Sequence, residues 1–203
     1  MQLTSFYIKE ELSQIGFKTF GENVLISRFA RFYHPERISI GSNVRIDDYC
    51  IFSAGGNITL GNYIHIAPYT SFIGEGDILV EDFCSISGRV SIYSSSDDYM
   101  GLAMTNPMIP QKYRRVQNQP VILRKHTIIG CDTVILPGVE FGEGASIGAK
   151  SLVKENCESE TIYTGNPLKE VGKRYQRYHK FENKFIEEIK LNNYERENNR
   201  DYQ

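Results

Sequence analysis

Apolar residues recur every twenty positions along the first half of the chain. Three columns show this period, the second and third lying six and twelve residues after the first. Their members are Phe20, Ile40, Leu60 and Val80, then Ile26, Ile46, Ile66 and Ile86, then Phe32, Phe52, Phe72 and Ile92. Such a period is typical of a solenoid whose coils stack a continuous core.

Beyond residue 120 the pattern returns with a bare six-residue period. Its apolar positions are Leu123, Ile129, Ile135, Phe141, Ile147 and Val153. A second register, four residues on, holds small or β-branched residues: Val24, Val44, Ile64 and Cys84, then Thr127, Thr133, Val139 and Ala145. Three short strands per coil, with turn residues at the corners, would make a triangular prism. We therefore predict an all-β solenoid over residues 18–153.

The same pattern delimits three further segments. Residues 1–17 have a weak helical period that ends at Gly16, which predicts a short helix capping the solenoid. Residues 154–203 leave the prism and contain a second helix, with one apolar stripe, over 175–197. The period is absent from residues 93–120, which are polar, aromatic and contain three prolines. We predict that this segment is an ordered arm extruded from one corner.

The composition fits one globular chain of 203 residues, with 40% hydrophobic and 24% charged residues. A net charge of −2 gives no electrostatic basis for nucleic-acid binding. No stretch is apolar enough to cross a bilayer, and the N-terminus is too charged for a secretory signal. Cys50 and Cys84 fall in the small inward register, which indicates reduced core thiols. We expect a cytoplasmic protein.

Residues 128–153, IIGCDTVILPGVEFGEGASIGAKSLV, with Gly-Asn-Pro at 165–167, resemble the hexapeptide-repeat acetyltransferases. The resemblance spans about residues 18–172 and is closest to the galactoside and maltose type. RIDDYC (45–50) and SSSDDY (94–99) also resemble the polysaccharide-cluster sugar O-acetyltransferases. The resemblance implies a left-handed parallel β-helix and a homotrimer with sites between neighbouring prisms. It also implies acetyl-CoA as cosubstrate along the C-terminal coils and an acceptor beside the arm.

The family's usual base is a histidine just before the arm, and the lattice places Asp97 there. Two interpretations stay open. Asp97 or Asp98 could take the proton, with a pKa raised by its neighbour and by burial. Alternatively, His65 is the base, because strand alternation turns it outward and its ordinary pKa suits neutral pH. The two interpretations can be combined: Asp97 or Asp98 would orient His65, and His65 would take the proton. The two residues could come from one subunit or from two.

For the cofactor, the resemblance places the pantetheine arm along the corners after the extruded arm. Gly130 and Cys131 lie at one such corner, and Gly148 and Ala149 lie further along the same column. The phosphates of CoA need cations, which the exit segment supplies. We expect Lys150, Lys154, Lys169 and Lys173 to form this phosphate-binding rim.

Five arm residues are of the types that hold sugars, through stacking on aromatic faces and hydrogen bonds to hydroxyls. They are Tyr93, Tyr99, Asn106, Tyr113 and Arg114. The histidines at 34, 65, 126 and 179 show no close pair, so we predict no metal site. His126 is expected to be a solvated strand residue.

These observations predict an acetyl-CoA-dependent O-acetyltransferase that acts on a sugar or glycan precursor in surface-polysaccharide synthesis. One alternative is an N-acetyltransferase of a nucleotide-linked amino sugar. It fits the missing histidine, because an amine can attack before it loses its proton. The other alternative is a non-catalytic solenoid with a binding or assembly role.

Overall fold

The computed structural model describes residues 5–200, and for residues 192–200 it describes the backbone alone. The chain divides into a first unit that ends at Lys173 and a second that begins at Arg174. The first unit opens with helix α1 (Lys9–Ile15) and its C-cap Gly16, whose φ of 89° lies in the left-handed region. Glycine reaches this conformation without strain, so the predicted helix end is confirmed.

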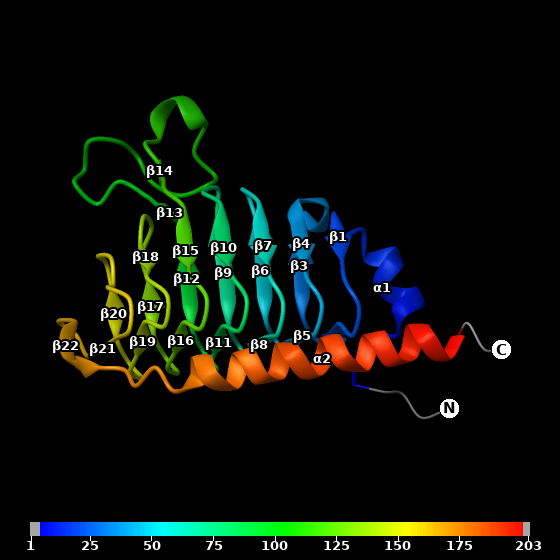
Figure 1. Ribbon diagram of the computed structural model, residues 1–203. Coiled ribbons are helices and arrows are strands. Elements are labelled where there is room, and N and C mark those ends of the chain that lie inside the picture. The colour runs from blue at the N-terminus through cyan, green and yellow to red at the C-terminus, as the bar shows by residue number, and fades with distance from the viewer. Residues whose placement is uncertain (1–4, 201–203) are drawn as a thin grey trace. The chain divides into compact units, whose positions relative to one another are not determined.

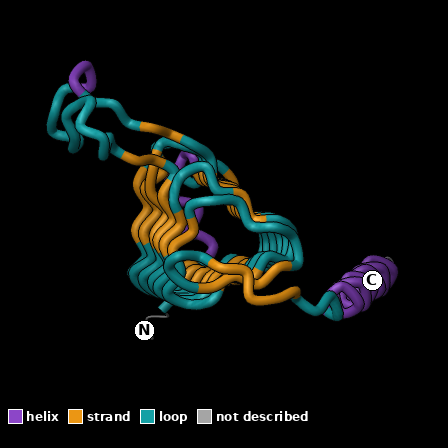
Figure 2. Tube along the Cα trace, turned by 90° about the vertical axis from the view of Figure 1, so that its left-hand side faces the viewer, coloured by secondary structure: helices purple, strands orange, loops and turns teal. Residues whose placement is uncertain are grey.

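Three sheets form the walls of a prism in the first unit, as the three-sided section in Figure 2 shows. The first sheet contains β1 (Thr19–Phe20), β4 (Ile38–Ile40), β7 (Ile58–Leu60), β10 (Ile78–Val80), β15 (Val121–Leu123) and β18 (Glu140–Phe141). The second contains β2 (Leu25–Ile26), β5 (Val44–Ile46), β8 (Ile64–Ile66), β11 (Ser85–Ile86), β16 (Ile128–Ile129), β19 (Ser146–Ile147), β21 (Thr161–Thr164) and β22 (Lys169–Lys173). The third contains β3 (Arg31–Tyr33), β6 (Ile51–Ala54), β9 (Ser71–Gly74), β12 (Ser91–Tyr93), β17 (Val134–Ile135) and β20 (Leu152–Val153).

The strand register reproduces the sequence lattice. Ile40 pairs with Leu60, twenty residues on, in a parallel ladder. Val80 pairs with Leu123 across the arm, and Leu123 pairs with Phe141 in the shorter period. Figure 1 shows the successive coils side by side. The chain is therefore a parallel β-solenoid, in agreement with the predicted β-helix class.

The inward columns form one continuous core. The core-facing columns are fully buried except at Phe20 and Phe32 in the first coil, which pack against the core from its edge. Phe52 and Phe72 are 0% exposed, and their rings stack with centroids 4.6 Å apart. Burying one such side chain contributes about 1.5–3 kcal/mol, so the period that identified the fold also supplies its main stabilisation.

Polar side chains on adjacent coils close one corner of the prism. Ser42 Oγ accepts the backbone N–H of Glu22, and the Asn62 side chain accepts that of Ser42. The Asp82 carboxylate then accepts the N–H of Asn62 at 2.7 Å. These bonds pair corner N–H groups that the strand ladders leave over.

The arm leaves the third sheet after β12 and returns at β15, as predicted. Its base is an antiparallel pair that the sequence did not indicate, β13 (Ser95–Ser96) with β14 (Gln117–Asn118). A short 3₁₀ helix, Gln111–Tyr113, lies near its far end. The two strands join the start and the end of the arm at its base (Figure 1). Residue 97 directly follows β13, so this pairing limits where it can lie.

Strand pairing continues past residue 153. Ile147 pairs with Tyr163 of β21, and β22 turns back antiparallel to β21. The physical reason is that an uncovered last coil would expose unpaired backbone groups. The second unit contains helix α2 (Tyr178–Arg200), which is as long as the predicted helix over 175–197 but begins and ends three residues later. Among the described residues, no helix is long and apolar enough to span a membrane.

Candidate active site

Asp97 lies at the base of the arm, directly after β13. It is half-buried, and no described residue donates a hydrogen bond or an ion pair to its carboxylate. A half-buried carboxylate without protein partners is free to accept hydrogen bonds from a ligand. Asp97 also lines two separate hollows on the outward face of the third sheet. These properties make it the centre of the candidate site.

The first of these, the β6–β9 hollow, lies between the arm and the earlier coils and has a volume of about 460 Å³. Its polar lining groups come from the solenoid and from the arm. They are His34, Ser53, Glu75, Ser95, Ser96, Asp97 and Arg114. Ile73, Pro107 and Val116 add apolar surface. Hydroxyl, carboxylate and guanidinium groups around small apolar faces suit a sugar-sized polar ligand.

The second, the β17–β20 hollow, lies on the other side of Asp97 and has a volume of about 730 Å³. Its walls are mostly apolar: Val134, Leu136, Pro137 and Leu152 come from the later coils. Tyr93, Tyr99, Ser95 and Ser96 complete the lining around Asp97. An apolar channel with polar groups at one end suits a thin acyl-pantetheine chain. Asp97 thus stands where two different ligands would meet.

Asp98 has a different environment from its neighbour. Its carboxylate accepts the backbone N–H groups of Met100, at 2.9 Å, and Ala103, at 2.6 Å. Burial by itself would raise the pKa of Asp98, but these hydrogen bonds outweigh it, and the pKa lies below its ordinary value. A carboxylate committed to a turn in this way is a poor proton acceptor, so Asp98 acts in the structure of the arm.

His65 points outward from β8, as strand alternation predicts, and its side chain is 46% exposed. Its partner within the chain is Asp47, whose carboxylate lies 2.7 Å from His65 Nε2, and not Asp97 or Asp98. Arg45 donates to the same carboxylate at 2.7 Å. Burial would raise the pKa of Asp47, but the hydrogen bonds from His65 and Arg45 lower it. The predicted pairing of His65 with the arm's aspartates is therefore absent from this chain, because the two groups lie on different sheets.

The residues of the predicted cofactor corner do stack from coil to coil, but the packing of the coils already explains why glycine occurs there. A Cβ on Gly130 would meet Ala149 N at 2.5 Å, in the corner of the next coil. A Cβ on Gly148 would meet the side chain of Thr164. Close coil stacking alone therefore requires both glycines. Cys131 is half-buried and Ala149 is exposed beside them, so a ligand at this column would contact these two first.

The four lysines predicted to bind phosphate lie around two strands at the C-terminal end of the solenoid. Lys150 precedes β20 and Lys154 follows it, so they lie at opposite ends of that strand. Lys169 and Lys173 are exposed on β22, in the second sheet, and Lys173 bonds Thr161 and Glu170. Their role in binding phosphate stays a prediction.

The predicted acceptor residues separate into two groups. Tyr93 and Tyr99 line the β17–β20 hollow and Arg114 lines the β6–β9 hollow. Asn106 caps the arm's own backbone by accepting the N–H of Met108, and Tyr113 is 52% exposed under Lys112. His126 is at a corner rather than on a strand, with its ring stacked on Phe83.

Glu75 is a lining residue that the sequence pattern did not single out. It occupies the corner Gly74-Glu75-Gly76, where the preceding coil has Gly55 and Gly56. Asn118 Nδ2 donates to its carboxylate at 2.9 Å, and Ser95 Oγ accepts its backbone N–H. The sequence did contain a signal for this residue, because a carboxylate replaces a corner glycine one coil before the arm.

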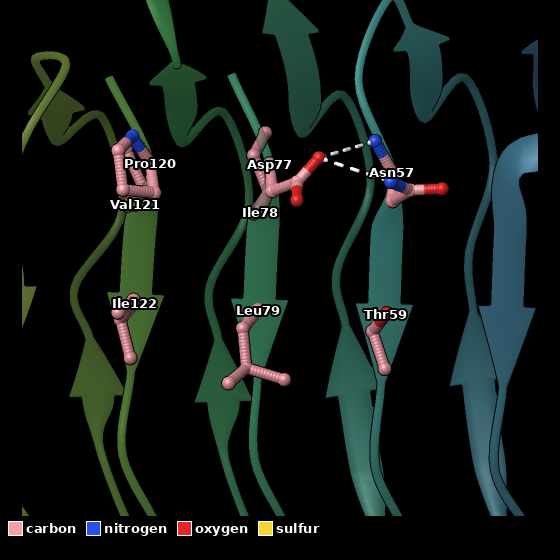
Figure 3. A pocket seen from close by; sticks show the side chains of 8 residues that line it. All are labelled: Asn57, Thr59, Asp77, Ile78, Leu79, Pro120, Val121 and Ile122. Carbon is pink, nitrogen blue, oxygen red and sulfur yellow. Dashed lines mark hydrogen bonds between the residues drawn. The ribbon is translucent and has the colours of Figure 1, made fainter.

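A third hollow, of about 330 Å³, lies on the first sheet (Figure 3). Its lining is largely apolar, and its single carboxylate, Asp77, accepts hydrogen bonds from the backbone and side chain of Asn57. Those lining side chains offer no uncommitted charged group, so this hollow is a weaker candidate than the pair at Asp97.

Comparison with known proteins shows the family of the chain. No family model matches the chain. An Escherichia coli dTDP-4-amino-4,6-dideoxy-D-glucose acyltransferase is 49% identical over 181 residues, which cover 88% of this chain and 94% of that protein. The chain belongs to the hexapeptide-repeat acyltransferases.

Solved structures of this family share the fold. AntD, an N-acyltransferase from Bacillus cereus, was crystallised with dTDP and 3-hydroxybutyryl-CoA. It is 45% identical, with a TM-score of 0.88, over 93% of this chain and all of that one. A maltose O-acetyltransferase from Clostridium difficile, at 18% identity and a TM-score of 0.54 over 83% of this chain and 75% of that one, shares the fold alone.

Proposed function

We propose that this acyltransferase moves an acyl group from a CoA thioester to the amino group of a nucleotide-linked amino sugar. The observation that carries the proposal is the unpartnered carboxylate of Asp97 between the two hollows. The β6–β9 hollow would hold the sugar and the β17–β20 hollow the acyl-pantetheine chain. Metal binding is no part of this proposal.

The relatives favour the amine acceptor over the hydroxyl acceptor that the sequence first suggested. The Escherichia coli acyltransferase and AntD, which each match about nine-tenths of this chain, are named for amino-sugar or N-acyl chemistry. The likeness to a putative lipopolysaccharide O-acetyltransferase of Escherichia coli is 30% identity over 34% of this chain and 36% of that protein. N-acylation, given above as an alternative, is therefore the better-supported reaction.

The chemistry also suits a site without a histidine at the arm. A neutral amine attacks the thioester carbonyl carbon, so a C–N bond forms and the C–S bond then breaks. The proton lost from nitrogen ends on the departing thiolate, giving free CoA. Asp97 would accept a hydrogen bond from the amine and aim its lone pair at the carbonyl, which asks for position more than for basicity.

AntD offers a parallel for the position of Asp97. That protein was crystallised with dTDP and CoA as variants of one aspartate and of a serine ten residues before it. The only serine in this sequence with an aspartate ten residues later is Ser87, with Asp97. Ser87 follows β11 at the corner between the second and third sheets, and Thr70 donates to its carbonyl. We include Ser87 as a further candidate for substrate contact.

Three broader proposals accompany this function. A homotrimer would bring the Ser87 corner of one subunit toward the arm of another, since within one subunit Ser87 precedes β12 and Asp97 follows it, toward opposite ends of the third sheet. A cytoplasmic location follows from the use of acyl-CoA and a nucleotide sugar, and from four free cysteines. A role in surface-polysaccharide synthesis follows from the sugar product.

The test incubates the purified protein with acetyl-CoA or 3-hydroxybutyryl-CoA and dTDP-4-amino-4,6-dideoxyglucose. Released thiol reports the transfer. The matched control replaces the amino sugar by the corresponding 4-hydroxy sugar nucleotide. We expect thiol release with the amine and at least 100-fold less with the hydroxyl. Equal rates with both acceptors would support the O-acetyltransferase instead, and no transfer to any sugar would refute both.

A further inference from the structure

Arg114 is the one cation that the arm contributes to the lining of the β6–β9 hollow. Its Nε is buried and has no hydrogen-bond partner, and its guanidinium makes no ion pair with any described residue. A guanidinium is never neutral in proteins, so burying its Nε–H without an acceptor carries a cost that a bound anion would offset.

The arm holds this side chain in place through its backbone. The Arg114 N–H bonds the carbonyl of Gln111 at 3.0 Å, within the turn of the 3₁₀ helix. Arg114 also forms a parallel bridge with Met104, on the opposite side of the arm. These two contacts fix the backbone from which the Arg114 side chain extends to the hollow.

The carboxylates and the guanidinium that line this hollow come from different segments of the chain. Asp97 and Glu75 come from the base of the arm and the solenoid corner, whereas Arg114 comes from the returning part of the arm. A nucleotide-linked 4-amino sugar also carries opposite charges at separate positions. Its diphosphate is attached to carbon 1 of the sugar, and its amine lies across the ring. An amine beside the carboxylates places the diphosphate on the side of the guanidinium.

We propose that Arg114 binds the diphosphate of the acceptor and thereby selects a nucleotide-linked sugar over a free one. A planar guanidinium fits phosphate oxygens with two parallel hydrogen bonds, which an ammonium cannot do. This inference rests on the proposed function for its ligand. Arg114 is a binding residue and takes no part in moving the proton.

The neighbouring Arg115 provides a matched control, because it has the same charge, is exposed and does not line the hollow. The variants are Arg114→Met, Arg114→Lys and Arg115→Met. Calorimetry measures the Kd for dTDP and for CoA, and steady-state assays measure KM and kcat for the amino-sugar nucleotide and for acyl-CoA.

We expect Arg114→Met to raise the Kd for dTDP and the KM for the amino-sugar nucleotide at least tenfold. The KM for acyl-CoA should change less than twofold, and Arg115→Met should change each value less than twofold. Arg114→Lys should recover part of the affinity. If the Met variant does not fold, the Lys variant carries the test, with an expected rise of about threefold or more.

Other results would overturn the inference. These are an unchanged Kd for dTDP in both Arg114 variants, an equal loss in Arg115→Met, an increase in the KM for acyl-CoA instead, or no binding of dTDP to the unaltered protein. If the unaltered protein binds dTDP through Arg114 but transfers no acyl group to an amino sugar, the proposed function fails and the diphosphate site stands.

Discussion

Gly74 connects the solenoid to the position of Asp97, and its replacement by alanine tests that connection. Its φ of +140° is strained for any residue with a side chain, at a cost of about 1–3 kcal/mol. An added Cβ would also lie 2.7 Å from Ser95 N and 2.9 Å from Ser94 C, so the strand that starts the arm must move. We expect a total cost of about 3 kcal/mol or more.

The assay is amide hydrogen exchange at the base of the arm, where Ser94 N–H bonds Ile73 and Gln119 N–H bonds Ser94. A loss of about 3 kcal/mol should make these amides exchange about 100-fold faster. Because Asp97 follows the displaced strand, kcat/KM for the amino-sugar nucleotide should fall at least tenfold.

Gly101→Ala is the matched control, because its φ of +77° carries a similar backbone cost while a Cβ there meets nothing within 4 Å. It should cost about 1–2 kcal/mol and leave exchange at Ser94 and Gln119 unchanged. Equal exchange rates in the two variants, or a Gly74→Ala protein with full activity, would refute the steric argument.

Four further predictions concern single side chains. Asp97→Asn should lower kcat/KM about tenfold, which corresponds to the loss of one hydrogen bond. If Asp97 transferred the proton, the loss would instead be 10²-fold or more. His65→Ala should change kcat/KM less than threefold. Asp47→Asn should lower the free energy of unfolding by about 1–2 kcal/mol at pH 7. Because the pKa of Asp47 is lowered on folding, that difference is present above its ordinary value of 3.8 and should vanish in unfolding curves as the pH falls below it. Burial raises the pKa of Cys84 to about 12, so a thiol reagent at pH 8 should modify Cys131 alone in the folded protein, and Cys131→Ser should abolish the reaction.

The sequence predicted the solenoid well because its information is local and repeated. An apolar residue recurs at a fixed spacing, and each coil repeats the packing of the coil before it. Ile40, Leu60 and Val80 could therefore be assigned to one column without coordinates. The same alternation placed His65 outward. The arm was predicted from the interruption of the period. Counting along the repeat singled out Asp97 as a candidate site residue.

The sequence could not decide which side chains meet. His65 and Asp47 are eighteen residues apart and belong to neighbouring coils, and their contact depends on the sideways reach of both. Asp97 and Asp98 are adjacent and chemically identical, yet one caps a turn while the other faces two hollows. That difference depends on the pairing of β13 with β14, which the repeat in the sequence does not predict.

What the sequence determined by itself is therefore the solenoid, its inward columns and the place where it opens, because a repeated steric pattern permits one way of stacking. Only the tertiary structure decided that Asp97 lies between two hollows and that Arg114 returns to the first of them. The arm is aperiodic, so its path depends on one antiparallel pair and on the space that Gly74 leaves beneath it.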